Sequence, residues 1–244
     1  MVKRIAPILQ ARMGSTRLPG KVLMKICGES ILSHIVKRVE LCDISPSHIW
    51  LPPVVATTTN PADDAIEFEC ARIGVKCCRG SEDDVLSRFY EVAVDSGAQN
   101  IMRICCDNPL LDPRFLSALA EFYCENHFSY VTNAQVPIGL ATEIFTFERL
   151  KDAYLYGQKK HHREHVTPFI YDNDDGCGYL VHEPDLSHLR FTVDTPEDFS
   201  FITEVYRNLF KHNPMFGLDE VLALLQKRPE LLEINKGIKQ KKLA

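Results

Sequence analysis

The sequence predicts an α/β fold, with a mostly parallel sheet, helices on both faces and a lid-like insert. Short β-type runs alternate with amphipathic helical patterns over residues 4–126. This alternation stops after residue 133 and returns over residues 189–210. Strands that alternate with helices favour parallel pairing, because each helix carries the chain back to the starting end of the sheet.

The expected strands are short runs of apolar and β-branched residues. The first run, "RIAPILQA", contains Pro7, which cannot donate a hydrogen bond to a neighbouring strand. Pro7 therefore predicts either a gap in the pairing or an edge beside this strand. Strands are expected at residues 4–11, 54–58, 75–78, 100–106 and 189–193.

The expected helices begin with residues that cap helix N-termini. Ser30 precedes a helical apolar pattern, and Asp112 is followed by Pro113. Thr195 and Asp198 have the spacing of a capping box, in which each side chain bonds the other residue's backbone. Helices are expected at residues 30–42, 60–74, 81–97, 112–126 and 195–210.

One domain, 1–244, accounts for the whole chain, because no repeat, low-complexity tract or flexible linker divides it. The segments 137–150 and 161–171 interrupt the alternation of strands and helices. We therefore expect residues 134–188 to form an insert over the sheet's edge.

Composition excludes several classes of protein. The formal charge is −5 and the pI is near 6.0, which argues against nucleic acid as the main partner. Nine Cys without a C-x-x-C pair argue against a zinc ribbon and favour a reducing, cytoplasmic location. No apolar stretch approaches membrane length, so we expect no membrane partner.

The segment "QARMGSTRLPGKVL" follows the first expected strand and predicts an anion site. Arg12, Arg17 and Lys21 offer positive charge, Gly14 allows close backbone approach, and Ser15 offers a hydroxyl. Loops after the first strand of such sheets often bind phosphate through backbone N–H groups. The spacing fits neither the P-loop nor the dinucleotide fingerprint. Three cations around one turn indicate a polyphosphate, and a solvated surface loop is the alternative.

The same segment closely resembles the signature loop of the cytidylyltransferases that activate sugars as CMP derivatives, in particular their SpsF-type branch, named for spore-coat polysaccharide synthesis. Relatives activate 3-deoxy-manno-octulosonate and acylneuraminate. Further motifs recur in the family's order: "RGSEDDVLSRFYEVA", "CDNPLLDP", "GLATEIF", "REHVTPFIY" and "FTVDTPEDF". The resemblance implies a nucleotide-diphospho-sugar transferase-like domain that transfers CMP from CTP to a sugar and releases pyrophosphate, for surface polysaccharide or glycoconjugate synthesis. It also implies a homodimer, with residues 134–188 as the sugar-side and dimerisation region.

The resemblance also implies roles for residues of the nucleotide side. Arg12 and Lys21 would hold the triphosphate and act in catalysis. Cytosine would lie near Arg79 and Ser81. The backbone beside the nucleotide would come from the opening loop, at Ala11, Met13, Gly14 and Ser15.

Two aspartates end expected strands and predict a metal site. Asp107 follows "IMRICC" and Asp194 follows "LRFTV". If these strands are neighbours in a parallel sheet, both carboxylates lie at the edge that carries the opening loop. Carboxylate oxygens are the ligands that Mg²⁺ prefers. An Asx turn is the alternative for Asp107, and both aspartates match the family's metal-binding positions.

The motif "HHREH" admits two interpretations. On the family's pattern, Arg163 and His165 contact the sugar, together with Glu143 of "GLATEIF"; surface charges without a ligand are the alternative. The motif also fits H-x-x-E-H, in which His161 and His165 would hold zinc and Glu164 would act as the base of a hydrolase. That hydrolase is a remote alternative.

Two further alternatives remain open. A sugar-nucleotide-dependent glycosyltransferase has a similar sheet, but usually holds its metal with D-x-D, which Asp107-Asn108-Pro109 does not match. A catalytically impaired relative is the other alternative. The family usually has Gly where this chain has Cys106, and a side chain there would crowd the nucleotide.

Overall fold

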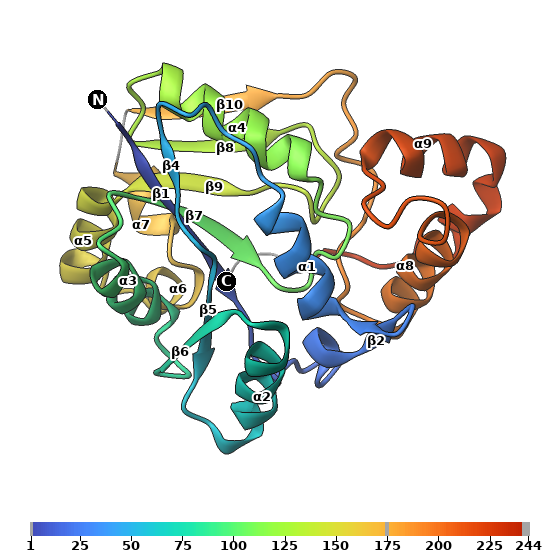
Figure 1. The fold of residues 1–244 in the computed structure, drawn as a ribbon, viewed down its shortest axis with the longest axis horizontal. Helices are drawn as coiled ribbons and strands as arrows, with labels where there is room; N and C mark the ends of the chain where they lie inside the picture. Colours follow the sequence, from blue (N-terminus) through green and yellow to red (C-terminus); the bar gives the residue numbers. More distant parts are fainter. Residues whose placement is uncertain (1, 174–175, 241–244) are drawn as a thin grey trace.

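A computed structural model of the chain describes residues 2–173 and 176–240. Its main sheet has eight strands in the order β10-β8-β9-β7-β1-β5-β6, with β4 paired to β1 (Figure 1). Among the described strands, β9 pairs antiparallel with both neighbours, and the other pairings in this sheet are parallel. The prediction of a mostly parallel α/β sheet is confirmed. The strands are β1 (Arg4–Gln10), β4 (Ile49–Trp50), β5 (Val54–Thr58), β6 (Lys76–Gly80), β7 (Asn100–Cys105), β8 (Tyr130–Ala134), β9 (Glu143–Thr146) and β10 (Cys177–Val181).

Pro7 lies in the central strand β1, where the neighbouring strand changes. Ile5 accepts a hydrogen bond from Leu51 N, just after β4, and Ala11 donates one to β5. Alternate residues of a strand bond to the same side, so the missing N–H of Pro7 falls between these two pairings. The predicted gap in the pairing is confirmed.

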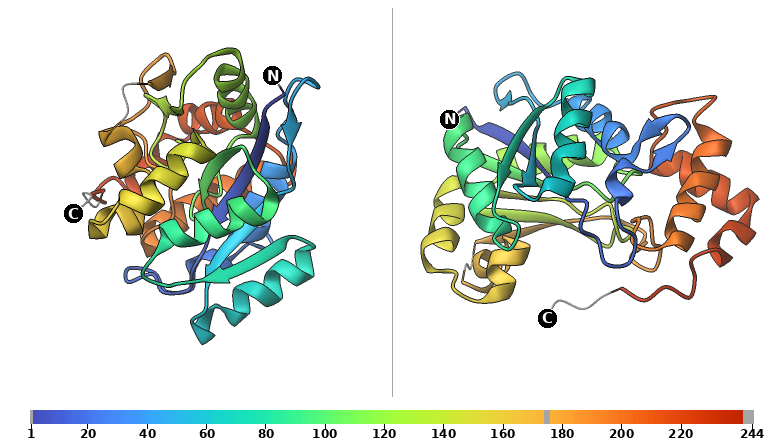
Figure 2. Two further views of the ribbon diagram at one scale, coloured as in Figure 1. Left: turned by 90° about the vertical axis from the view of Figure 1, so that its left-hand side faces the viewer. Right: turned by 90° about the horizontal axis from the view of Figure 1, so that it is seen from below.

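Helices cover both faces of the sheet, as predicted. One face packs against α3 (Val85–Ser96), α5 (Phe147–Tyr156) and α7 (Pro168–Asp172), around Phe89, Leu150 and Ile170. The other face packs against α1, α2 and α4, and the helices α8 and α9 lie beside α1. Figure 2 shows α5 to α7 at one end of the molecule and α8 and α9 at the other. The remaining helices are α1 (Ile31–Glu40), α2 (Asp64–Ile73), α4 (Pro113–Glu125), α6 (Lys160–His165), α8 (Pro196–Leu209) and α9 (Leu218–Lys227).

Short elements complete the described chain. A two-stranded antiparallel sheet, β2 (Lys25–Ile26) with β3 (Glu29–Ser30), leads into α1. The 3-10 helices are η1 (Lys21–Leu23), η2 (Pro61–Asp63) and η3 (Pro229–Glu233). Within the described residues, no helix is both long and apolar enough to cross a membrane.

The predicted helix caps are confirmed. The Ser30 hydroxyl accepts a hydrogen bond from Ser33 N at 2.9 Å, and Asp112 accepts one from Arg114 N at 2.9 Å. Thr195 and Asp198 form the reciprocal capping box. These local signals place the ends of α1, α4 and α8 within a residue or two of the expected positions.

Two expectations for the second half of the chain are wrong. Residues 189–193 form only an isolated bridge, between Arg190 and Ile138, because Phe191 N and Val193 N bond to two different loops, at Ile138 O and Asp107 O. Residues 134–188 do not simply lie over the sheet's edge. They supply β9 between β7 and β8, and its Ile144 and Phe145 are both buried, as befits a strand covered on both faces.

Candidate active site

A cavity of about 420 Å³ opens at the carboxyl ends of β1 and β7. Its lining combines the opening loop, the ends of these strands, and residues of the loops near Gly139 and Thr192. In open α/β sheets, ligands bind at this edge, because the loops that follow parallel strands gather there. The cations that line the cavity are Arg12, Arg17, Lys21 and Arg103.

The opening loop is held in shape by backbone bonds and one buried carboxylate. Met13 O accepts hydrogen bonds from Ser15 N at 2.8 Å and from Gly20 N at 2.9 Å. Gly20 has φ of 71°, a left-handed conformation that glycine adopts without a steric penalty. Asp63, which is buried, accepts the N–H of Met13 at 2.7 Å. The loop is therefore anchored on both sides of its turn.

Lys21 joins the two aspartates. Its Nζ donates to Asp107 Oδ2 and to Asp194 Oδ1, each at 2.8 Å. Lys21 is only 8% exposed, so this triad lies in a partly desolvated environment. The structure thus brings together both predicted metal ligands and one predicted triphosphate ligand.

Charge pairing shifts the pKa values of Lys21 and Asp194. Burial alone would lower the pKa of Lys21, but the Asp107 and Asp194 carboxylates outweigh burial and raise it above its usual value. Burial would raise the pKa of Asp194, but Lys21, Arg17 and Arg190 outweigh burial and lower it. Lys21 is therefore protonated and Asp194 ionised at neutral pH.

Asp194 is positioned by a second ion-pair network. Its Oδ2 contacts Arg17 at 2.9 Å and Arg190 at 3.0 Å. The buried Asp198, the capping acid of α8, accepts from Arg190 Nε at 2.8 Å and from Asp194 N at 3.1 Å. Asp198, which caps α8, thus also orients Asp194, one of the two predicted metal ligands.

Asp107 and Asp194 meet although no strand ends at Asp194. Val193 N donates to Asp107 O at 2.8 Å, which fixes the two loops directly against one another. Gly139, with φ of 103°, allows the third loop to join them, because a Cβ there would lie 2.7 Å from Thr192 N. The predicted proximity is confirmed, but backbone bonds between loops produce it.

The opposite side of the cavity is built on Arg103 and Glu143, which face each other on β7 and β9. Arg103 donates to Glu143 Oε2 at 2.7 Å and to Gln10 Oε1 at 3.3 Å. Glu143 Oε1 also accepts the hydroxyls of Tyr130 at 2.6 Å and Thr167 at 2.8 Å. Glu143 therefore orients Arg103, which lines the cavity, while His165 lines it from α6.

Some predicted site residues lie outside this cavity. Arg79 pairs with Asp64 at 2.6 Å and Glu67 at 2.9 Å, at the start of α2. The Ser81 hydroxyl accepts from Asp84 N at 3.2 Å, and Arg163 pairs with Asp84 at 2.8 Å. These contacts place the three side chains around the starts of α2 and α3. Among the predicted backbone contacts, Ser15 borders the cavity, whereas Ala11, Met13 and Gly14 lie behind it.

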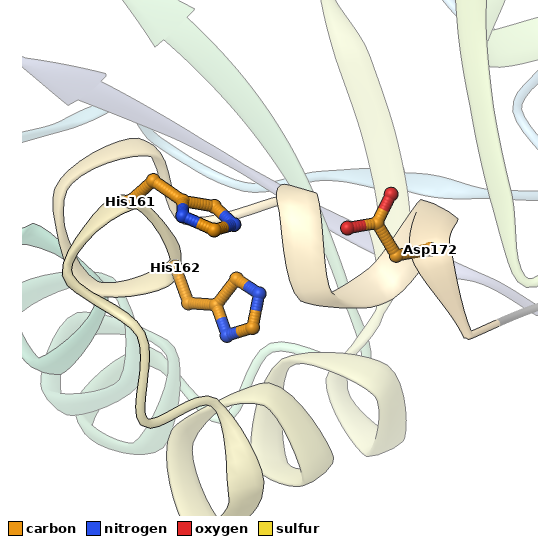
Figure 3. Close-up of side chains that lie close together, drawn as sticks. All are labelled: His161, His162 and Asp172. Atoms are coloured by element: carbon orange, nitrogen blue, oxygen red, sulfur yellow. The ribbon is translucent and has the colours of Figure 1, made fainter. Parts of the chain in front are cut away.

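The H-x-x-E-H arrangement does not form within the described residues. Glu164 and His165 line the cavity, whereas His161 groups with His162 and Asp172 (Figure 3). The metal-binding side chains that come together are His161, His162 and Asp172, and this group includes neither Glu164 nor His165. The hydrolase alternative loses its ligand set.

Cys106 borders the cavity, but its side chain is 1% exposed and packs in the hydrophobic core with Ile104. Burial also raises the pKa of its thiol well above the usual value, so the thiol stays protonated. The side chain therefore points into the core and leaves the cavity open.

Sequence reasoning missed Arg103 and Arg190. Both lie within apolar segments that predict buried strands, "NIMRICC" and "LRFTV". A charged residue in such a run is seldom buried without a partner, and this was the signal available. The partners, Glu143 and Asp198, come from distant segments that the sequence alone does not bring together.

Comparison with known proteins identifies a family and several relatives of this chain. Residues 6–238 match the model of a family described as Cytidylyltransferase. The spore coat polysaccharide biosynthesis protein SpsF of Bacillus subtilis is 32% identical, over 91% of this chain and 94% of its own. The uncharacterized protein MJ1063 of Methanocaldococcus jannaschii is 36% identical, over 98% of this chain and 97% of its own.

A solved cytidylyltransferase from Leptospira borgpetersenii superposes with a TM-score of 0.88 at 26% identity, over 98% of this chain and 100% of its own. The 3-deoxy-manno-octulosonate cytidylyltransferase of Solibacter usitatus is 33% identical, over 48% of this chain and 44% of its own.

Proposed function

The chain belongs to the cytidylyltransferase family, and on that premise we propose that it transfers CMP from CTP to the hydroxyl of an acidic sugar, releasing pyrophosphate. The observation that carries the proposal is the cavity in which Lys21 contacts both Asp107 and Asp194 beside two further cations of the opening loop. Such a site suits a polyphosphate because it offers cations to the phosphate oxygens and carboxylates to a divalent metal.

The residues fit a Mg²⁺ ion. Both carboxylates reach the same Lys21 nitrogen at 2.8 Å, so they already converge on one cationic group. Asp107 and Asp194 would hold the ion, which when bound would offset negative charge on the triphosphate. Lys21 would then turn from the carboxylates to the phosphate oxygens.

The chain's own residues perform binding and positioning. Arg12, Arg17 and Lys21 bind the triphosphate and orient its α-phosphorus toward the sugar side. The sugar oxygen attacks this phosphorus, the bond to the β-phosphate bridging oxygen breaks, and the hydroxyl proton is released. Once the triphosphate is bound, these cations would already face the developing charge and need no further reorganisation during the reaction, which would accelerate transfer.

Two buried polar atoms of the cavity support an acidic, hydroxylated sugar. Arg103 Nε and Asn108 Oδ1 are buried and have no hydrogen-bond partner within the described residues. Both residues line the cavity, where the Arg103 guanidinium would suit a carboxylate and the Asn108 amide would suit a hydroxyl. Arg103 takes the place that sequence reasoning gave to Arg163, while Glu143 acts through Arg103.

The biological setting is also part of this proposal. The match to SpsF supports a role in surface polysaccharide or glycoconjugate synthesis. The nine cysteines include no C-x-x-C pair, which supports a reducing, cytoplasmic location. The homodimer would use residues 134–188, whose strand β10 lies at the end of the sheet and exposes Tyr179 and Val181.

Pyrophosphate release from CTP, measured with a panel of sugars, tests the proposal. We expect release with Mg²⁺ and an ulosonic acid, and little release when the acid is replaced by its neutral analogue. Release that is equal for neutral sugars would contradict the acidic substrate. Hydrolysis or transfer from a sugar nucleotide, without pyrophosphate release from CTP, would instead identify a glycosyltransferase.

A further inference from the structure

A group of three polar side chains on α6 and α7 takes no part in the proposed reaction. His161 and His162 lie on α6, and Asp172 ends α7. In Figure 3, both imidazole rings extend toward the side of α7 that carries Asp172. One ligand atom from each residue lies within 4.8 Å of the other two. We propose that these three residues bind a zinc ion that ties α6 to α7.

His162 gives the independent reason to expect a ligand. His162 is only 5% exposed, yet neither nitrogen of its ring has a hydrogen-bond partner within the described residues. Burying an imidazole without a partner costs free energy, because water no longer bonds its nitrogens. His34 shows the contrast: it is 4% exposed, and its Nε2 contacts Ile26 O at 2.8 Å.

The surroundings of His162 leave one side for a ligand. The Phe169 ring packs edge-on against the imidazole, at 5.5 Å between ring centroids, and the His161 ring lies at 4.4 Å. Phe169 offers no acceptor to the ring nitrogens. The polar groups near the ring include Lys159 and two metal-binding residue types, His161 and Asp172.

The ligand atoms that these three residues offer favour zinc over Mg²⁺. Two imidazole nitrogens and one carboxylate oxygen are common zinc ligands, whereas Mg²⁺ prefers oxygen ligands alone. Tetrahedral zinc places its ligand atoms about 3.3 Å apart, so these atoms would approach each other by at most about 1.5 Å. Asp172 is exposed and His161 is partly exposed, so rotation of their side chains supplies this movement while His162 stays in place.

The proposed ion would act on the structure of the cavity wall. Glu164 and His165, at the end of α6, line the cavity, and Val166 follows with a positive φ of 71°. A β-branched residue rarely adopts this conformation, so the turn depends on the packing of α6 and α7 around it. Zinc between the two helices would stabilise this turn. This inference is independent of the proposed transfer reaction.

Zinc titration of the purified full-length chain, with a competing chromogenic chelator, tests the site. We expect one zinc ion per chain. His162→Leu should weaken binding about 100-fold and Asp172→Asn about 10-fold, because each removes one ligand. The matched control is His212→Ala, which removes an exposed histidine after α8 and should leave zinc affinity unchanged.

A second measurement separates binding from folding. His162→Leu should match or exceed the wild-type Tm without metal, because it removes unpartnered nitrogens, and it should lose the rise in Tm that zinc gives the wild type. Asp172 is exposed, so Asp172→Asn tests the site without disturbing the core.

Two results would overturn the inference. One is equal zinc affinity in the wild type and in both ligand variants. The other is zinc binding that a thiol-blocking reagent removes and His162→Leu retains, which would assign the ion to cysteines.

Discussion

The two sides of the cavity handle their charges differently. On the proposed phosphate side, Lys21 and Arg17 already contact carboxylates, so a triphosphate bound there would have to displace these contacts. On the sugar side, Arg103 is fixed by Glu143 and Gln10 and still has an unpartnered Nε. We therefore expect the proposed phosphate side to rearrange on binding and the proposed sugar side to bind as it stands. Preorganised groups lose less conformational entropy when a ligand binds.

Removing a carboxylate from the phosphate side should have the largest effect. We expect Asp107→Ala to lower turnover about 1,000-fold at saturating CTP, because the charge of the leaving pyrophosphate would lose its stabilisation. Pyrophosphate release measures this effect. Asp43→Ala, at an exposed position after α1, is the control and should leave turnover unchanged. Near-normal turnover in Asp107→Ala would remove this residue from the metal site.

Removing the bridging cation should have the next largest effect. Lys21→Ala should lower kcat/KM for CTP about 100-fold and leave the KM of the sugar nearly unchanged, because the lysine binds the triphosphate. The exposed Lys25 provides the matched control, Lys25→Ala. If Lys21→Ala changes only the Tm, the opening loop is structural and the two sides do not differ as described.

A conservative change on the sugar side should have a smaller and selective effect. Arg103→Lys keeps the charge but loses the guanidinium fork, so the KM of the acidic sugar should rise about 10-fold at constant KM for CTP. Initial rates at varied sugar concentrations measure this change. An equal rise in the KM of CTP would show that Arg103 serves both substrates.

The pH dependence of stability should show the smallest effect. The pKa of Asp194 is lowered, so the stabilisation that this carboxylate gives the fold is complete above its unfolded pKa, near 3.9. It is lost as the pH falls through the folded pKa. The pKa of Lys21 is raised, so the stabilisation that this lysine gives the fold is complete below its unfolded pKa, near 10.4. It is lost as the pH rises through the folded pKa.

Asp194→Asn should therefore lower the free energy of unfolding by about 1–3 kcal/mol at pH 7, and the difference from the wild type should shrink below pH 4. Urea unfolding at both pH values measures it. A difference that persists unchanged at low pH would show that the carboxylate charge is not responsible.

The gathering of Arg12, Arg17 and Lys21 at one cavity was largely predictable because these residues lie in one short segment. Arg12, Arg17 and Lys21 occur within ten residues, and their spacing signals an anion-binding turn. The caps of α1, α4 and α8 were predictable for the same reason, since each depends on a few neighbouring residues.

The sugar side was not predictable because it depends on strand order. Arg103 meets Glu143 only because β9 enters the sheet antiparallel beside β7, and no local signal places a strand there. The position of Asp194 shows the same limit. Its pairing with Asp107 was expected from neighbouring strands, but hydrogen bonds between loops create it.

Thermal stabilisation by nucleotides tests the central claim most directly, because it requires no knowledge of the sugar. CTP with Mg²⁺, at about 100 times its Kd, should raise the Tm by about 5–10 °C. UTP, GTP and ATP should give clearly smaller shifts, and CTP without Mg²⁺ should lose part of the effect. Equal shifts with all four nucleotides, or none with any, would contradict a CTP-dependent site between the opening loop and the two aspartates.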